Sequence, residues 1–329
     1  MGGEVNASRM SIDLDTDNRL SAAESNVHYE WDNSNEAVLT VQPGETVHIE
    51  CRDSWDRLVN AETTVEELPE LTADKGGMPL TGPIAVADAE PGDVLEVEIL
   101  EVDHADWGWT VFRPGHQEVG LLPEEFPNWG LHYWDLDSEG GVGHYVDEIE
   151  IPLSPFPGTI GVAPGEDGSH STTPPRNVGG NMDTKHLTAG TTLYLPVEAS
   201  GALFSVGDGH AAQGDGEVCG GAIETPMDIA LRFNVHSDRS IDAPQYHMPG
   251  GDASLGGPAY ATMGIDSDLM AAAKSAVSDM VAHLHEERGL SRPKAYILTS
   301  VAADLRINEV VDRPNWAVSA HLPESIFPE

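Results

Sequence analysis

The stretch Val94-Leu-Glu-Val-Glu-Ile-Leu-Glu-Val102 is the clearest indicator of how this chain folds, because apolar and acidic residues alternate along it. Successive side chains of a β-strand point to opposite faces, so this alternation places the apolar residues on one face and the carboxylates on the other. The turn sequence Glu90-Pro-Gly-Asp93 directly precedes it. The stretch therefore predicts a long strand with one buried face.

Similar strand-like runs, separated by turn sequences such as Gln42-Pro-Gly44, occur on both sides of this stretch. They span 37–41, 45–51, 81–86, 142–151, 159–163, 191–197, 202–206 and 227–235. Many short strands with frequent turns are typical of a β-sandwich or a jelly-roll-like barrel. The alternation of strands and helices that builds a parallel α/β sheet is missing here.

The C-terminal part has the pattern of a helix. Residues 267–288 carry apolar side chains at helical spacing, begin at a capping Ser or Asp, and end before Gly289. We further expect a strand over 295–300 and a short second helix over 300–311. The predicted class is mainly β (α+β): a sandwich or jelly-roll-like core of many short strands, with a C-terminal helix and a smaller α/β portion.

The domain organisation predicted from the sequence is simple. Residues 1–26 form a polar, acidic leader that we expect to be mobile, and residues 27–329 form a single domain without internal repeats. No apolar segment resembles a signal peptide or approaches the roughly 18 residues that cross a bilayer. We therefore expect a cytoplasmic protein that does not bind membranes.

Charge is the unusual feature of the composition. The chain of 329 residues has 56 Asp and Glu against 16 Lys and Arg, a formal net charge of −40. Self-repulsion of this size weakens a compact state, whereas molar salt shortens the Debye length to about 3 Å and screens it. Because the acids are spread along the whole chain, we interpret them as an adaptation to a salt-rich cytoplasm. The lack of a basic stripe argues against nucleic-acid binding.

Candidate functional residues lie in a Gly-rich segment, Gly207-Asp-Gly-His-Ala-Ala-Gln-Gly-Asp-Gly-Glu217, which Glu224 follows. Asp208 and His210 are two residues apart, so on an extended strand both side chains reach the same face. Asp183, next to Gly179-Gly180, offers a third ligand. Carboxylates and imidazole in this pattern suit a divalent metal ion or a pair of general acid/base groups.

Structural explanations remain open for several of these residues. An Asp between glycines often only bonds nearby backbone N–H groups, which is our interpretation of Asp215 and an alternative for Asp208. The roles of His116, His170 and Glu217 stay undecided. Four tryptophans either wall a pocket or pack in the core, and they are Trp107, Trp109, Trp129 and Trp134.

Nucleophilic mechanisms find less support. Ser205 lies outside a Gly-x-Ser-x-Gly elbow, and Ser169 beside His170 also lacks such a context. The two cysteines, Cys51 and Cys219, are too few for a disulfide framework and lack zinc-finger spacing. Acidic neighbours would also raise the pKa of a Cys219 thiol and make it a poor nucleophile.

Longer motifs resemble those of the acetamidase/formamidase family, with the similarity running from about residue 37 to the C-terminal end. The matching motifs are Gly158-Thr-Ile-Gly-Val-Ala-Pro164, Pro174-Pro-Arg176, Gly180-Asn-Met-Asp183, Leu195-Pro-Val197, Gly201-Ala-Leu-Phe204, the 207–217 segment and Ala222-Ile-Glu224. The resemblance implies hydrolysis of a short aliphatic amide, formamide or acetamide, to ammonia and a carboxylate. It also implies a β-rich fold and a homo-oligomer, which we expect to be a dimer.

The site residues taken from these motifs can be given roles. We expect Asp183, Asp208 and His210 to bind a divalent metal, zinc in the first place and calcium as the alternative. Glu224 would act as the general base, and Asn181 or the N–H groups of Gly179-Gly180 would stabilise the oxyanion. The competing hypothesis is a non-catalytic protein in which the same carboxylates close a structural calcium site.

Overall fold

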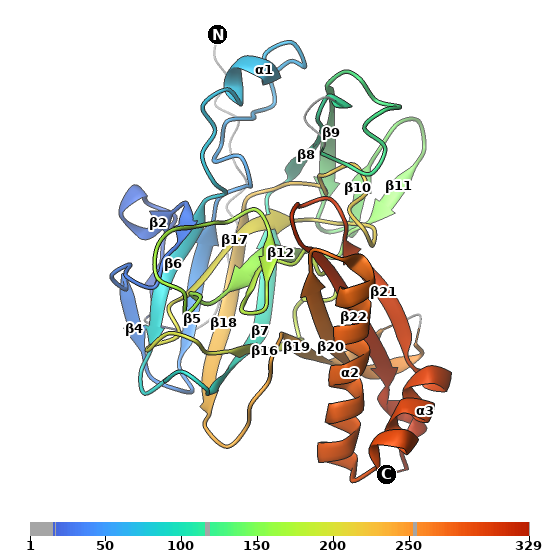
Figure 1. Cartoon of the computed structure of the whole chain (residues 1–329). Coiled ribbons are helices and arrows are strands. Elements are labelled where there is room, and N and C mark those ends of the chain that lie inside the picture. Colours follow the sequence, from blue (N-terminus) through green and yellow to red (C-terminus); the bar gives the residue numbers. More distant parts are fainter. Residues whose placement is uncertain (1–15, 17, 116–118, 253–254, 329) are drawn as a thin grey trace.

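A computed structural model describes residues 16, 18–115, 119–252 and 255–328 (Figure 1). Its largest sheet has nine strands, of which β18 and β7 pair along most of their length. Its strands, in spatial order, are β1 (Arg19–Leu20), β5 (Thr46–Cys51), β18 (Met227–His236), β7 (Val94–His104), β16 (Thr192–Pro196), β19 (Gln245–Asp252), β20 (Gly257–Asp266), β22 (Trp316–Pro323) and β21 (Asp304–Glu309).

A second sheet, of seven strands, carries most of the Gly-rich motifs. Its strands are β14 (Pro175–Arg176), β15 (Gly179–Asn181), β12 (Phe156–Gly161), β17 (Phe204–His210), β6 (Leu80–Val86), β2 (Val27–His28) and β4 (Leu39–Val41), which pairs with β6. Buried side chains of both sheets, such as Ile99 of β7 and Phe204 of β17, belong to one hydrophobic cluster. The two sheets therefore form a sandwich, which confirms the predicted fold class.

Two small sheets complete the β structure. They are the four-stranded sheet β11 (Glu150–Pro152), β10 (Val142–His144), β9 (Gly130–Asp137) and β8 (Trp107–Phe112), and the pair β13 (His170–Ser171) and β3 (Glu30–Trp31). The helical segments are η1 (Glu24–Asn26), α1 (Leu68–Leu71), α2 (Leu269–Arg288), α3 (Arg292–Ala302) and η3 (Glu324–Ile326). None of the helices in the described part of the chain is long and apolar enough to cross a membrane.

Strand β7 has the predicted two faces. Leu95, Val97 and Ile99 are buried in the core between the sheets. On the other face, Glu98 pairs with Arg232 at 3.2 Å, and Glu96 accepts a hydrogen bond from Asn234 at 2.9 Å, both partners lying on β18. The alternation thus predicted both the strand and the direction of its core.

Helix α2 also matches the prediction. The Asp268 side chain accepts a hydrogen bond from the backbone of Ala271 at the N-terminus, and Gly289 takes a left-handed conformation at the C-terminus. Its buried residues, among them Ala272 and Leu284, pack against β20, β22 and α3.

The prediction for the segment after α2 was wrong. Residues 295–300 belong to helix α3, and half of the expected short helix over 300–311 is strand β21. Pro293 occupies the first turn of α3, and the buried side chains Ala295 and Thr299 are four residues apart, as on a helix face. The apolar residues that suggested a strand, Tyr296 and Ile297, are exposed.

The expected leader over 1–26 is described only in its last part. There, β1 pairs in parallel with β5 through Arg19↔His48, and Arg52 donates hydrogen bonds to the carbonyl of Ala22. Residues 1–15 and 17 lie outside the described residues, as does His116.

Candidate functional site

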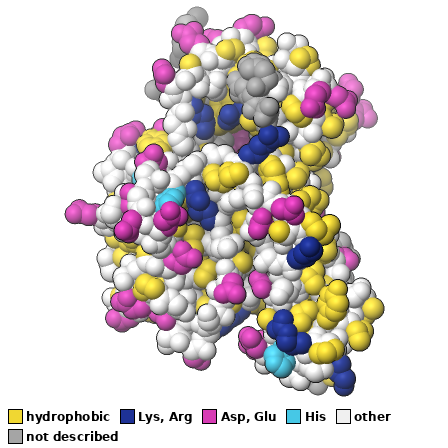
Figure 2. Space-filling model, viewed as in Figure 1, with side chains coloured by type: hydrophobic (Ala, Val, Ile, Leu, Met, Phe, Trp, Pro, Cys, Tyr) yellow, Lys and Arg dark blue, Asp and Glu magenta, His cyan; other side chains and the backbone are white. Residues whose placement is uncertain are grey.

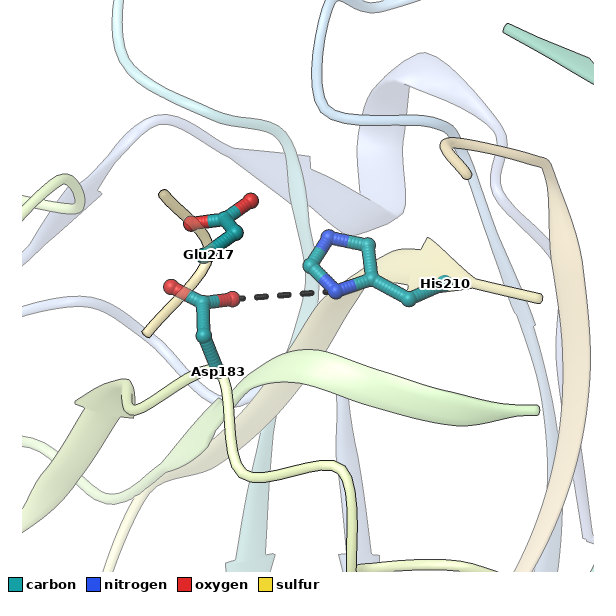
Figure 3. A group of neighbouring side chains, drawn as sticks. All are labelled: Asp183, His210 and Glu217. Carbon is teal, nitrogen blue, oxygen red and sulfur yellow. Dashed lines mark ion pairs between the residues drawn. The ribbon is translucent and has the colours of Figure 1, made fainter. Parts of the chain in front are cut away.

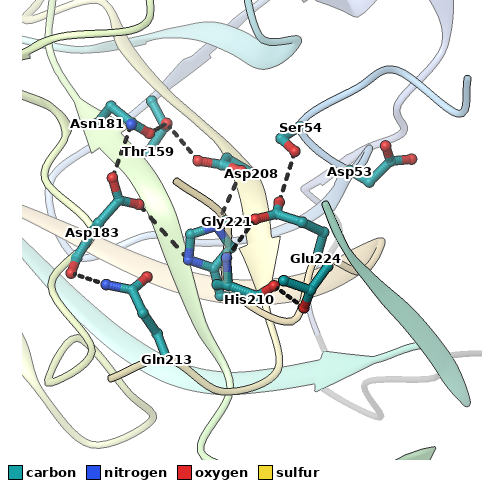
Figure 4. A network of polar contacts seen from close by, with 12 residues as sticks. Asp53, Ser54, Thr159, Asn181, Asp183, Asp208, His210, Gln213, Gly221 and Glu224 are labelled. Atoms are coloured by element: carbon teal, nitrogen blue, oxygen red, sulfur yellow. Dashed lines mark hydrogen bonds and ion pairs between the residues drawn. The ribbon is translucent and has the colours of Figure 1, made fainter. Parts of the chain in front are cut away.

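Three neighbouring strands of the seven-stranded sheet bring the predicted residues together (Figure 4). In the pairing of β12 with β15 and β17, Thr159 lies opposite Asn181 and Phe156 lies opposite His210. Glu224 comes from the segment after β17 and forms isolated β-bridges with Trp109 of β8 and with His210. The predicted convergence of distant segments is therefore present.

His210 lies at the centre of the group and is almost fully buried. Its Nε2 is 3.2 Å from Asp208 Oδ1 and 3.3 Å from Glu224 Oε1. Its Nδ1 is 3.7 Å from Asp183 Oδ1 (Figure 3). The side chains of Asp208 and His210 thus reach the same site, as the sequence spacing predicted.

Gly158 forms the floor of the site. A Cβ at this position would lie 2.6 Å from His210 Cε1, 2.7 Å from Asp183 Oδ1 and 2.7 Å from Asp208 Oδ2. These distances are shorter than ordinary van der Waals contact, so the three side chains can meet only over a glycine.

Three of the carboxylate residues have strained backbones. Asp183, Asp208 and Glu217 have φ values of 44°, 59° and 46°. A positive φ is uncommon for a residue other than glycine, and such conformations cluster at functional sites because the surrounding structure must stabilise them. Here the backbone turns point all three carboxylates toward one region.

Glu224 is held in a fixed orientation. The Ser54 hydroxyl donates a hydrogen bond of 2.7 Å to Glu224 Oε2, and the Ala222 N–H donates one of 3.0 Å to Oε1. The carboxylate therefore faces His210 and the cavity with both oxygens already positioned. Nothing in the sequence pointed to Ser54, which lies 170 positions earlier.

Asn181 does not have the contacts expected of an oxyanion donor. Its Nδ2 donates to Asp183 Oδ2 at 2.8 Å and to Asp312 Oδ2 at 2.6 Å, while its Oδ1 accepts from the Thr159 hydroxyl. Both amide hydrogens are therefore used to hold carboxylates. These hydrogen bonds orient Asp183, and the role of Asn181 in oxyanion stabilisation stays a prediction.

The electrostatics of the site are dominated by burial and by crowding of like charges. Burial raises the pKa of Asp183 well above its usual value, and Glu217 and Asp312 add to the effect. Burial, followed by the charge of Asp312, likewise raises the pKa of Glu217. Burial alone would lower the pKa of His210, but Glu224 and Asp208 outweigh it and raise that pKa well above its usual value.

This group fits a divalent cation. Two sets of three ligand atoms lie within 4.8 Å of one another, one from Asp183, His210 and Glu217 and the other from Asp208, His210 and Glu224. Asp183 Oδ1 and His210 Nδ1 are buried without a hydrogen-bond partner and face each other. A cation near these atoms would satisfy both and would favour ionised carboxylates.

The two sets differ from the expected one. Asp183 and Asp208 were predicted to share a metal with His210, but each instead groups with His210 and a glutamate. Glu217, whose role the sequence left undecided, is thus a candidate ligand, and its position in the Gly-rich motif was the available signal. Asp312 was missed, because no local pattern marks it.

Other candidates lie outside the group. Asp215 forms an ion pair of 2.9 Å with Lys185, and His170 bonds the carbonyl of Glu166 at the surface. Ser205 is hydrogen-bonded to His28 at 2.8 Å, but it is completely buried and cannot reach a substrate. The contacts of these residues are structural.

The group opens into a cavity of about 380 Å³. Trp109 and Trp55 line it and pack edge to face with ring centroids 5.0 Å apart. Trp109 is also part of a buried apolar cluster, so it serves both the core and the pocket wall. Buried carboxylates and an imidazole in a cavity lined by both polar and apolar side chains are typical of an enzyme active site.

Comparison with known proteins identifies the family. The model of the acetamidase/formamidase family matches residues 13–171 and 166–329, so this chain belongs to that family, as its motifs predicted.

Relatives of known name extend over most of the chain. It is 24% identical to the formamidase of Methylophilus methylotrophus, with 96% of this chain and 93% of that protein covered. An acetamidase of Mycolicibacterium smegmatis is 28% identical over 60% of this chain and 63% of its own length. Among solved structures, the acetamidase of Bacillus halodurans has a TM-score of 0.83 and 31% identity, covering 94% of this chain and 98% of that one.

Proposed function

We propose that this protein hydrolyses the C–N bond of a short aliphatic amide, formamide or acetamide, to ammonia and the carboxylate. The family and its named relatives support this activity. The observation that carries it is the convergence of Asp183, Asp208, Glu217 and Glu224 on His210, next to a cavity.

The donor set suits a bound divalent metal, with zinc as the first candidate and calcium as the alternative. Both ligand sets combine one imidazole with two carboxylates, which are donor types that zinc accepts. The set of Asp183, His210 and Glu217 leaves Glu224 free to act as the base. A bound ion would supply Lewis-acid polarisation of the amide carbonyl and a water of lowered pKa. Asn181 would keep Asp183 oriented through the hydrogen bond of 2.8 Å.

Glu224 would move the protons. Its Oε1 faces His210, and the bonds from Ser54 and Ala222 hold it without using all of its acceptor capacity. In hydrolysis it would accept a proton from the attacking water and return it to the departing nitrogen. The C–N bond then breaks as the new C–O bond is retained, and ammonia leaves.

An ammonia-release assay tests the function. We expect turnover of formamide or acetamide at high salt, its loss with a chelator, and its recovery on adding metal. Glu224→Gln should lower kcat by about 10²- to 10⁴-fold while metal content is retained. Glu101→Gln, on the exposed part of β7, is the matched control.

The competing function is a structural calcium site without catalysis. It would give bound calcium in stoichiometric amount and no ammonia from any small amide. Wild-type kinetics in Glu224→Gln would instead support amide hydrolysis and show that Glu224 is not the general base.

We also propose that the protein forms a homodimer through the face made by α2, α3 and β21. Tyr296, Ile297 and Val301 are 62%, 64% and 75% exposed there, and the groove beside them is lined by Lys274 and Arg292 but by no acidic side chain among the described residues. Figure 2 shows hydrophobic side chains gathered over these C-terminal helices. A chain of charge −40 can associate with a second copy only where acids are scarce.

Light scattering at molar salt tests this dimer. Val301→Asp should convert the dimer to a monomer, because it places a charge in each half of a symmetric interface. A wild-type monomer, or a dimer that tolerates the charge, would rule this face out.

A further inference from the structure

Three cationic side chains line the cavity in a chain that has few of them. Lys75 and Arg113 line the same cavity as the carboxylates, together with Arg313. These are three of only 16 Lys and Arg in the whole chain. Figure 2 shows Lys and Arg side chains around a hollow, with an acidic side chain inside it. The concentration of rare cations at this one place calls for a chemical reason.

Neither Lys75 nor Arg113 has an ion-pair partner among the described residues. The Arg113 guanidinium instead lies over the Trp55 ring, 5.4 Å from its centroid. Trp55 is buried and packs against Trp109 and Trp129, so it is a fixed support. Arg113 is thus held at the cavity wall by stacking, which leaves its N–H groups available for a ligand.

The two cations also disfavour each other. Burial lowers the pKa of Lys75, and the charge of Arg113 lowers it further, while the fields of Asp208, Glu224 and Asp53 act in the opposite direction. Burial likewise lowers the pKa of Arg113, against the field of Asp312. Two partly buried like charges are costly to hold together; the carboxylates of the site offset part of that cost, and a ligand anion in contact with both cations would offset more of it.

The cavity has room for a ligand larger than formamide. Its volume of about 380 Å³ lies within the range of ordinary ligand pockets and far exceeds the needs of formamide. Its lining also includes Met78, Val111 and Trp109, which suit methylene groups.

We propose that Lys75 and Arg113 bind a carboxylate group of the substrate, so that the enzyme prefers the monoamide of a short dicarboxylic acid over a neutral amide. This inference rests on the proposed amide hydrolysis. The reaction is the same one: water adds its oxygen to the amide carbon, the C–N bond breaks, and nitrogen leaves as ammonia. The dicarboxylate product carries one more negative charge than the substrate and is repelled by the carboxylates of the site, which favours its release.

Matched substrates test the preference directly. Succinamate and succinamide have the same length and shape, but only succinamate carries a carboxylate. At fixed high salt we expect wild-type kcat/KM to be at least about tenfold higher for succinamate, because a charge-assisted hydrogen bond is worth that factor or more. Malonamate and glutaramate determine the best spacing, and equal rates for succinamate and succinamide would overturn the inference.

Variants assign the preference to the two cations. Lys75→Met and Arg113→Gln should each reduce the succinamate-to-succinamide ratio by about tenfold, acting mainly on KM. Lys294→Met, an exposed lysine on α3, is the control and should keep the wild-type ratio. A ratio that stays unchanged in both cavity variants would overturn the assignment. If one variant fails to fold, the other variant and the wild-type comparison of succinamate with succinamide still test the proposed carboxylate site.

The two hypotheses fail in distinguishable ways. Turnover of acetamide without any preference for succinamate would leave the proposed function intact and refute the carboxylate site. If no amide is hydrolysed, the proposed function fails, and calorimetry on Glu224→Gln with succinamate and succinamide tests the binding alone. Equal affinity for both compounds would then refute the carboxylate site as well.

Discussion

Replacing Gly158 by alanine adds one methyl group at the floor of the site and changes nothing else. The backbone of Gly158 is not in the left-handed region, so alanine can adopt it. The new Cβ would lie 2.6 Å from His210 Cε1, where ordinary contact begins at 3.4 Å. The imidazole must therefore move by about 0.8 Å (3.4 minus 2.6), and the carboxylates of Asp183 and Asp208 by about 0.7 Å (3.4 minus 2.7).

Displacements of this size have two measurable effects. Overpacking a rigid site should lower the free energy of unfolding by about 1–3 kcal/mol. Misplacing reacting groups by about 1 Å should lower kcat about 100-fold. Metal content should fall as well, because three candidate ligands of both sets are displaced together.

The assay combines ammonia release, metal analysis and denaturant unfolding on purified protein. Gly214→Ala is the matched control, because its Cβ would meet nothing within 4 Å and its backbone is also ordinary. The control should behave as wild type in all three measurements. Wild-type kinetics and metal content in Gly158→Ala would show that His210 and the two aspartates do not act as one site.

Two further predictions concern stability. If the acidity is an adaptation to salt, raising potassium chloride from 0.1 M to molar concentrations should raise the midpoint of thermal unfolding. The reason is that salt screens the repulsion within a chain of net charge −40. A midpoint that does not change with salt would contradict this interpretation. The ring of His283 stacks on that of Tyr260, with centroids 3.9 Å apart. Burial, aided by the charge of Arg239, lowers the pKa of His283 from 6.5 to about 4. As the pH falls, His283 therefore takes up its proton at a higher pH in the unfolded chain than in the folded protein. Stability should drop between about pH 6.5 and 4 by at most about 3 kcal/mol, and denaturant unfolding of His283→Gln should lack this drop. Parallel pH curves for the two proteins would refute it.

How much of the fold could be predicted depended on whether its signals were local. Strand β7 was predicted because its alternation marks both faces, and α2 because a capping Asp268 and a terminal Gly289 delimit it. Helix α3 was misread because its apolar residues do not all face the core: Ala295 is buried, whereas Tyr296 and Ile297 are exposed. An apolar run of that kind has no single period, and tertiary packing decides its structure.

The site was predictable in its components and less so in its grouping. Asp208, His210 and Glu224 belong to one segment, so the sequence placed them together. The grouping of Asp183 with Glu217 in one candidate ligand set depends on a left-handed backbone at both residues. Neither Asp nor Glu is a residue type that predicts this conformation. Ser54 and Asp312 reach the site through the topology alone, because each lies more than 80 positions from the central motif.

The glycines of the central motif explain why fold and site coincide. A Cβ at Gly207 would lie 2.3 Å from the carbonyl oxygen of Pro79, and one at Gly209 would lie 2.5 Å from that of Thr225. Both glycines thus let neighbouring backbone approach β17 closely, and the N–H of Thr225 donates to the carbonyl of Gly209 at 2.8 Å. That contact fixes the segment beginning at Glu224, so the carboxylate reaches His210 because of how the strands pack. A larger residue at Gly209 would therefore misplace Glu224 without touching it.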